Sequence, residues 1–235
     1  MGLMISDLFH TLNRDVSNIP VKFISEEGLK GVVDVYWSNN DPAHNVKHLI
    51  DVLNSAQVMC EKLGVEYSRV IEFGCMFHDA GMNRTQRSKH HIHAAIEFLE
   101  MVERVMGTES SIQLTPHEIS SIVECIVNHR SSNPDIDKCS IEAKVVHASD
   151  KGVPATTKER FIEKILSRSV KYHMSQNYSK RDDAHVNAYN HIMAKYSHNG
   201  YVKFSKLYNE VFEEEIKMQK NLAERCVEEG WRYDD

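Results

Sequence analysis

The chain has 235 residues, a formal net charge of −6, 41% hydrophobic residues and 26% charged residues. These values fit one globular domain, or one domain with an appended helical piece. The acidic balance excludes a general nucleic-acid binder, which is usually basic, and no run approaches the roughly 20 apolar residues needed to cross a bilayer.

The first helical patterns lie in the N-terminal third of the chain. Strand-like alternation is scarce, and its best example, at residues 32–37, is short. Residues 1–39 are therefore predicted to be an N-terminal helical extension. Asp41 and Pro42 together can open the next helix, in which apolar residues recur at three- and four-residue steps. Gly64 can end that helix, and a further apolar helix leads towards residue 81.

The second half of the chain continues the helical pattern. Residues 115–118 form a capping box with proline at the first helical position. Ser140 can cap a helix that leads to Asp150, and residues 152–154 end it. Three further helices are predicted at 155–174, 182–197 and 203–229. The sequence therefore predicts an all-α fold, arranged as a helical bundle.

Several of the 14 histidines have the spacing of metal ligands. His44 and His48 are four residues apart, which places both rings on one face of a helix. His78 and Asp79 are adjacent at the end of an apolar helix, and together they offer a mixed nitrogen and oxygen site. Asp150 ends another apolar helix, where a carboxylate is costly unless something pairs with it. A divalent metal ion would provide that partner.

The order of a histidine, a His-Asp pair and a distant aspartate resembles the HD-domain superfamily of metal-dependent phosphohydrolases. The resemblance covers roughly residues 40–155, so these residues are predicted to form an HD metal-binding core, with residues 156–235 as additional C-terminal helices packed on it. The family's metal ligands correspond here to His48, His78, Asp79 and Asp150.

Residues 44–48, with the pattern H-N-x-x-H, are also similar to an element of cyclic-nucleotide phosphodiesterases and some bacterial HD nucleotidases. That resemblance implies that His44 donates a proton to the leaving oxygen. Residues 90–95 and 126–130 resemble further ligand segments of six-ligand HD proteins. They imply His90 as a ligand, with His93 as the rival one turn later, and His129. These ligands would complete a two-metal site bridged by Asp79.

The chain also lacks several sequence elements that mark particular groups within this superfamily, so the resemblance does not identify the substrate. Ala43 stands where an aromatic residue is common, and neither an H-P-G nor a G-Y-P element is present. Basic side chains next to the motifs are candidates for holding phosphate, because arginine pairs with phosphate bidentately. They are Arg84, Arg87, Lys89, Arg130 and Lys151.

The expected function is a phosphohydrolase that cleaves a phosphate ester or anhydride of a nucleotide or cyclic nucleotide. His44 and Asp79 would be catalytic, with one or two divalent ions (Mn, Co, Zn, Mg or Fe) that activate water. The alternatives are an HD-type di-iron oxygenase and a binding module with a relic site. The absence of a signal-like start and of paired cysteines predicts a cytoplasmic protein. A phosphorylated small molecule is the expected partner, and a homo-oligomer stays open.

Overall fold

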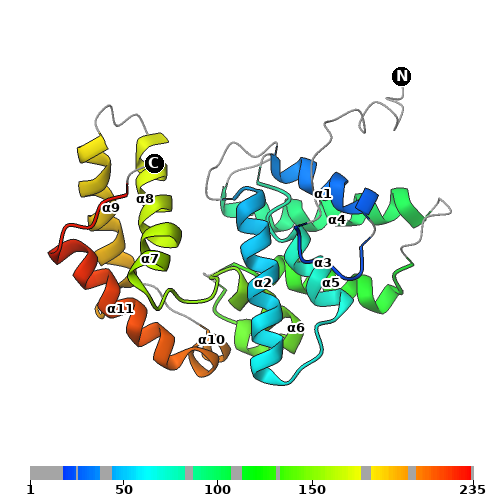
Figure 1. Cartoon of the computed structure of the whole chain (residues 1–235). Coiled ribbons are helices and arrows are strands. Elements are labelled where there is room, and N and C mark those ends of the chain that lie inside the picture. Colours follow the sequence, from blue (N-terminus) through cyan, green and yellow to red (C-terminus); the bar gives the residue numbers. More distant parts are fainter. Residues whose placement is uncertain are drawn as a thin grey trace.

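The computed structural model is built from helices (Figure 1). It describes residues 18–24, 26–37, 44–82, 87–106, 113–130, 133–175, 181–200 and 205–233. No strand occurs among these residues, which confirms the all-α prediction. The strand-like segment 32–37 belongs to helix α1 (Glu26–Trp37) instead. Three residues of α1, Leu29, Val32 and Val33, are buried in the core, so its apolar residues follow a helical and not a strand spacing.

Five helices surround the first of two apolar clusters. They are α2 (Val46–Leu63), α3 (Arg69–Phe77), α4 (His90–Met106), α5 (Pro116–Asn128) and α6 (Ile141–Ser149). Helix α3 packs against all four of the others, and every residue from Ile71 to Phe77 is buried. The expected capping box is present at the start of α5, where Thr115 and Glu118 each accept from the other's backbone N–H.

A buried glutamate anchors the segment that precedes α1. Glu72 of α3 has no exposed surface. Its two carboxylate oxygens accept from the backbone N–H groups of Lys22 (2.6 Å) and Phe23 (2.8 Å). Burial raises the pKa of Glu72, and these N–H groups act in the opposite direction. The backbone donors thereby satisfy a carboxylate that would be costly in an apolar core.

The C-terminal helices enclose a second apolar cluster, which includes Phe161, Leu166, Ala188 and Trp231. The predicted helix 155–174 is divided into α7 (Lys158–Phe161), the π-helical turn η4 (Ile162–Leu166) and α8 (Ser167–Ser175). Helix α9 (Arg181–Tyr196) follows. The predicted helix 203–229 is broken at Phe212 into α10 (Lys206–Val211) and α11 (Glu213–Glu228).

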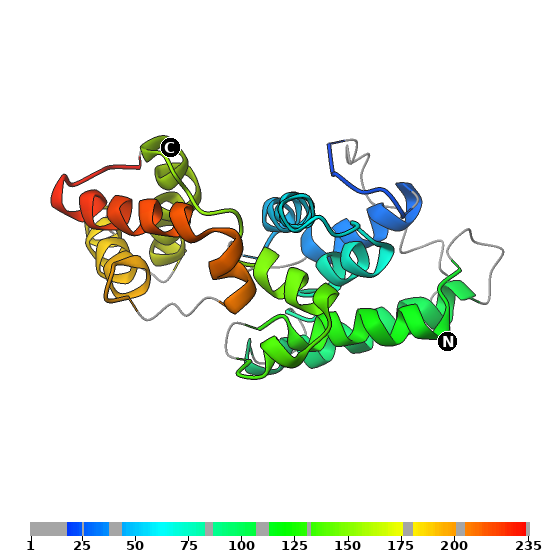
Figure 2. The same cartoon turned by 90° about the horizontal axis from the view of Figure 1, so that it is seen from below.

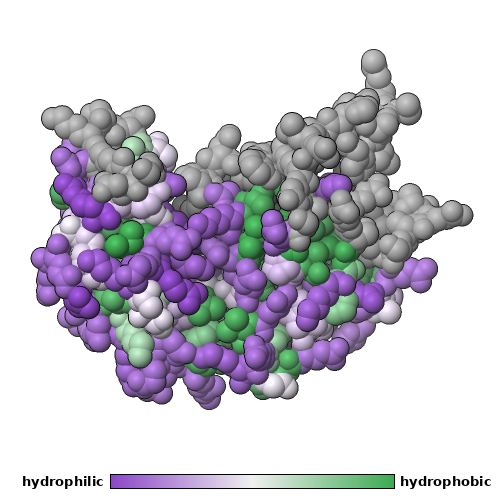
Figure 3. All heavy atoms as spheres, in the orientation of Figure 1, coloured by the Kyte–Doolittle hydropathy of each residue, from purple (hydrophilic) through white to green (hydrophobic). Residues whose placement is uncertain are grey.

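The two groups of helices lie side by side, and α10 lies between them in both ribbon views (Figures 1 and 2). Helix α10 packs on α2 and α6, and the Tyr208 hydroxyl donates to the carbonyl of Gly152 at 2.7 Å. Lys62 of α2 pairs with Glu215 of α11 at 2.6 Å. Hydrophilic residues cover much of the face in Figure 3. None of the described helices has the length and apolar character to cross a membrane.

Candidate metal centre

Five helix ends bring the predicted ligands together. His48 lies in the first turn of α2, and His90 is the first residue of α4. His78, His129 and Asp150 are the C-terminal caps of α3, α5 and α6. A residue at a helix end can turn its side chain away from the helix axis, because the backbone there is only half constrained. Ligands from five separate helices can therefore point at one place.

The predicted start of α2 is wrong by a few residues. Asn45 is the N-cap, and its side-chain oxygen accepts from the backbone N–H of His48 at 3.2 Å. His44 consequently precedes the helix and does not share a turn with His48. An asparagine side chain competes well for the first free N–H groups of a helix. The expected opening at Asp41 and Pro42 lies outside the described residues.

The first ligand group combines His48, His78, Asp79 and Asp150, whose ligand atoms all lie within 4.8 Å of one another. Oδ2 of Asp79 is 3.1 Å from Nε2 of His78 and 3.4 Å from Nε2 of His48. Oδ1 of Asp150 is 3.3 Å from Nε2 of His48 and 3.8 Å from Nε2 of His78. Two imidazole nitrogens and two carboxylates thus converge on one buried point.

The second ligand group combines Asp79 with His90 and His129, again within 4.8 Å of one another. Here the other oxygen of Asp79, Oδ1, is 3.2 Å from Nε2 of His90 and 3.5 Å from Nε2 of His129. Asp79 therefore belongs to both groups and presents a different oxygen to each. His93, the rival of His90, is in neither group among the described residues.

Two of the histidines are held with Nε2 turned towards the site. Nδ1 of His78 is 2.7 Å from the carbonyl oxygen of Cys75, and Nδ1 of His129 is 2.6 Å from that of Ile126. A carbonyl can only accept, so each Nδ1 carries the proton and donates it. In the neutral ring, Nε2 then has a free electron pair suited to a metal.

The histidine nitrogens also approach each other closely. Nε2 of His48 is 3.2 Å from Nε2 of His78, and Nε2 of His90 is 2.9 Å from Nε2 of His129. Two electron pairs at such distances repel unless a proton or a metal cation lies between them. Together with the surrounding carboxylates, this donor set fits a divalent ion of the borderline or hard class.

The carboxylates determine the electrostatics of the centre. Burial lowers the pKa of His48, but hydrogen bonds and charge from Asp150 and Asp79 outweigh it and raise the pKa to about 9. Burial raises the pKa of Asp79, yet the charge of His78 and hydrogen bonds from His129 and His48 hold it well below its usual range. Without a metal, the centre therefore favours a protonated His48 beside an ionised Asp79, whereas burial lowers the pKa of His129; a bound cation would replace the proton on His48.

His44 lies at the edge of this centre and belongs to neither ligand group. Its Nε2 is 3.8 Å from Oδ2 of Asp79, and its ring packs edge-on against that of His48 with the centroids 5.6 Å apart. The side chain of His44 is 16% exposed, whereas His78 and His129 are almost fully buried. His44 can therefore contact both solvent and a molecule bound beside Asp79.

Comparison with family models, curated proteins and solved structures gives no match to this chain. The HD-domain resemblance accordingly stays a prediction. The structure itself establishes a buried cluster of histidine and aspartate side chains in an all-α fold. The residues of this cluster could hold a metal ion.

The predicted phosphate-binding residues are only partly gathered at the centre. Lys151 is adjacent, because its Nζ is 2.9 Å from Oδ2 of Asp150. The Arg130 guanidinium donates to the carbonyl of Ser88 at 2.6 Å and so braces the turn before His90. Lys89 is exposed. Arg84 and the side chain of Arg87 lie outside the described residues.

Residues from the C-terminal helices that sequence reasoning missed also lie near α2. Asp51 follows His48 by three residues, and its carboxylate pairs with Lys164 (3.1 Å) and with Arg168. More than a hundred residues separate these partners in the chain, so no local spacing could reveal them. In the sequence, Gly81 is notable only as a glycine that follows an apolar helix, but in the structure its backbone packs directly on α4. An added Cβ would lie 2.4 Å from the backbone nitrogen of Ala94.

Proposed function

We propose that the chain is a metal-dependent phosphohydrolase of the HD-domain type, acting on a phosphate ester or anhydride of a nucleotide or cyclic nucleotide. The observation that carries the proposal is the position of Asp79. One carboxylate offers its two oxygens to two separate ligand groups, at 3.1–3.4 Å on one side and 3.2–3.5 Å on the other. Two-metal sites with a shared carboxylate are suited to in-line displacement at phosphorus.

The six ligands would divide between two ions. His48, His78 and Asp150 would hold one ion, His90 and His129 the other, and Asp79 both. When bound, such ions lower the pKa of water and offset negative charge on phosphoryl oxygens. Burial of the ligands supports this role, because the surrounding apolar core limits access of bulk water and strengthens electrostatic interactions.

His44 would provide the proton for the leaving oxygen. Its Nε2 is close enough to Asp79 to reach a group bound there, while it stays outside both ligand groups. A histidine that does not coordinate can carry the proton that a ligand histidine must give up. Lys151, whose Nζ lies 2.9 Å from Oδ2 of Asp150, would contact a phosphoryl oxygen from that side of the centre.

The test is a screen of nucleotides, cyclic nucleotides and an aryl phosphate with Mn²⁺, Co²⁺, Zn²⁺ or Mg²⁺, with product identification. We expect metal-dependent release of phosphate or of a nucleotide product. His90→Gln should abolish it, whereas His93→Gln, which changes the same residue type one turn later on α4, should not. Iron retention with oxygen consumption and no phosphate product would instead support the di-iron oxygenase.

A further inference from the structure

The C-terminal helices present two cations to the same stretch of α2 that holds a metal ligand. Nζ of Lys164 lies 3.1 Å from Oδ1 of Asp51, and the Arg168 guanidinium pairs with Oδ2. Asp51 is three residues after His48, a spacing that places neighbouring Cβ atoms about 5–6 Å apart on a helix. All three side chains of this pairing are partly exposed, at 16% for Asp51, 27% for Lys164 and 34% for Arg168. The cations therefore lie beside Asp51, one turn of α2 after His48, and remain accessible to solvent.

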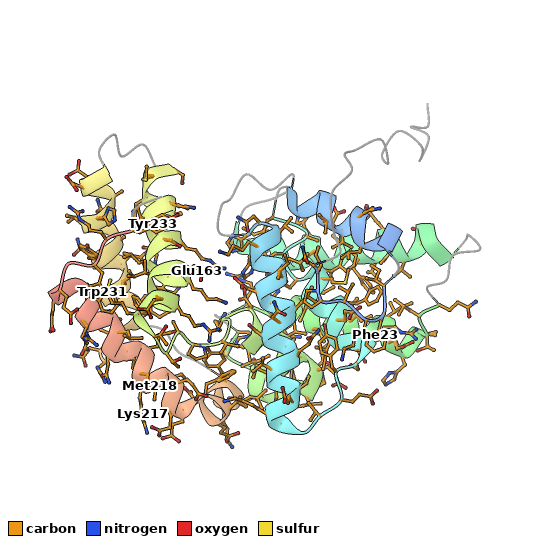
Figure 4. All side chains as sticks on the ribbon, viewed as in Figure 1. Phe23, Glu163, Lys217, Met218, Trp231 and Tyr233 are labelled. Carbon is orange, nitrogen blue, oxygen red and sulfur yellow. The ribbon has the colours of Figure 1, made fainter. Side chains whose placement is uncertain are left out.

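A second ion pair also joins α2 to the π-helical turn η4. Lys47, the residue before His48, pairs with Glu163, the residue before Lys164, at 3.1 Å. Figure 4 shows Glu163 on the side of the C-terminal helices that faces α2. Both partners are 60% exposed, so this pair adds little stability by itself. Its position nevertheless confirms that η4 and the start of α8 face the first turns of α2.

The cations project from an unusual segment of helix. Lys164 lies within the π-helical turn η4, and Arg168 lies in the first turn of α8 directly after it. A π-helical turn adds a residue to the α-helical repeat, which rotates the following side chains by roughly 100° relative to an uninterrupted helix. Such turns often occur at functional sites. Here the turn lies where Lys164 and Arg168 reach the same carboxylate.

The local charge balance leaves room for an anion. Two cations share one carboxylate, and each uses a different oxygen of Asp51. An ammonium group has three N–H donors and a guanidinium five, whereas one carboxylate has only two oxygens. Lys164 and Arg168 therefore have more donors than Asp51 can accept. Phosphate, with several oxygens and a double charge, suits this surplus better than a neutral group.

We propose that Lys164 and Arg168 bind a second phosphoryl group of the substrate, next to the one held at the metal centre. The substrate class is then a compound with at least two linked phosphates, such as a nucleoside di- or triphosphate, and not a simple monoester. Asp51 keeps the two cations oriented before the substrate arrives. This inference rests on the proposed phosphohydrolase centre and names the substrate class of that site.

The test compares two probes that cannot be hydrolysed, methylphosphonate and methylenediphosphonate, by calorimetry on the metal-loaded full chain. In the wild type, methylenediphosphonate should bind more tightly than methylphosphonate. Arg168→Gln and Lys164→Gln should each weaken methylenediphosphonate by roughly 10- to 100-fold, the scale of a charge-assisted hydrogen bond. Binding of methylphosphonate should change by less than about threefold, since it needs only the metal centre.

Arg160→Gln is the matched control, because Arg160 is exposed on α7, two turns before Arg168. It should leave both probes unaffected. Metal content measured before and after each titration detects any ion removed by the diphosphonate. Unchanged diphosphonate binding in Arg168→Gln and Lys164→Gln, or equal weakening of both probes, would overturn the inference.

The outcome is separable from that of the proposed function. Phosphate esters hydrolysed normally by the wild type, with no effect of Lys164 or Arg168 on diphosphonate binding, would reject this inference alone. Diphosphonate binding that depends on both residues, in a chain that hydrolyses no phosphate compound, would reject the proposed function and keep the anion site.

Discussion

Replacement of Asp79 by asparagine tests whether one carboxylate serves two metal ions. The change keeps the size of the side chain, removes its charge and replaces one oxygen with an amide nitrogen that cannot coordinate. Because Oδ2 faces His48 and His78 while Oδ1 faces His90 and His129, one ligand group loses its Asp79 oxygen and the other keeps only a neutral amide oxygen, which is a weaker ligand. His129→Gln, in contrast, changes only the second group. We expect two ions in the wild type, one in His129→Gln and none in Asp79→Asn.

The stability effect of these losses can be estimated from binding linkage. An ion present at a hundred times its dissociation constant stabilises the folded chain by about 2.7 kcal/mol. For a chain of this size, each kcal/mol raises the melting temperature by roughly 2–4 °C, so the first ion should add about 5–11 °C. The shift is measured within each variant, with and without metal. Any destabilisation of the metal-free Asp79→Asn protein therefore cancels.

The assay is thermal unfolding followed by circular dichroism, with elemental analysis of dialysed protein. Asp79→Asn should give no melting shift with metal, and His129→Gln should keep part of the wild-type shift. If Asp79→Asn retained one ion with the same shift as His129→Gln, the carboxylate would not be shared. The assignment of both groups to a single two-metal centre would then be wrong.

Three further predictions follow from the geometry. His44→Asn should keep both ions but lose about two to four orders of magnitude in rate. The loss should be smaller for a nitrophenyl ester, because its leaving group needs little protonation. Loss of metal in this variant would show that His44 is a ligand. His48 must lose a proton to coordinate, and its pKa of about 9 lies above the ordinary 6.5. Metal affinity should therefore rise up to about tenfold per pH unit between pH 6.5 and 9. In the metal-free chain, the stabilisation from charged His48 should be complete below pH 6.5 and vanish as pH passes 9, and a titration without this slope would contradict the ion pairing. Gly81→Ala should destabilise by about 1–3 kcal/mol in urea, because its Cβ would meet the backbone of α4, and an unchanged midpoint would show that α4 moves freely.

The ligand set was predictable because its signals are local. His78 and Asp79 stand at the end of an apolar helix, and Asp150 ends another, so burial and the need for a partner could be inferred from short stretches. The choice of His90 over His93 depended on family resemblance alone. It agrees with the geometry, in which His90 lies beside Asp79 and His93 belongs to neither ligand group among the described residues.

The features that escaped prediction depend on contacts between distant residues. The break at Phe212 has no glycine or proline to mark it. Phe212 turns its ring against that of Tyr208 at 5.1 Å and is 1% exposed, so packing interrupts the helix there. The π-helical turn at 162–166 likewise has no sequence signature. Nearness to the motifs along the chain indicates Lys151. It cannot indicate Lys164 or Arg168, which reach Asp51 of α2 only through the fold.

The wide separation of the ligands along the chain has a consequence for folding kinetics. They run from residue 48 to residue 150 on five helices, and no single helix brings enough of them together to hold an ion. Contacts of such long range form late, because chain entropy opposes them until most helices have packed. An ion that recognises only the finished arrangement should slow unfolding and leave the refolding rate almost unchanged. The bound ion would then stabilise the folded state kinetically, and would not accelerate folding.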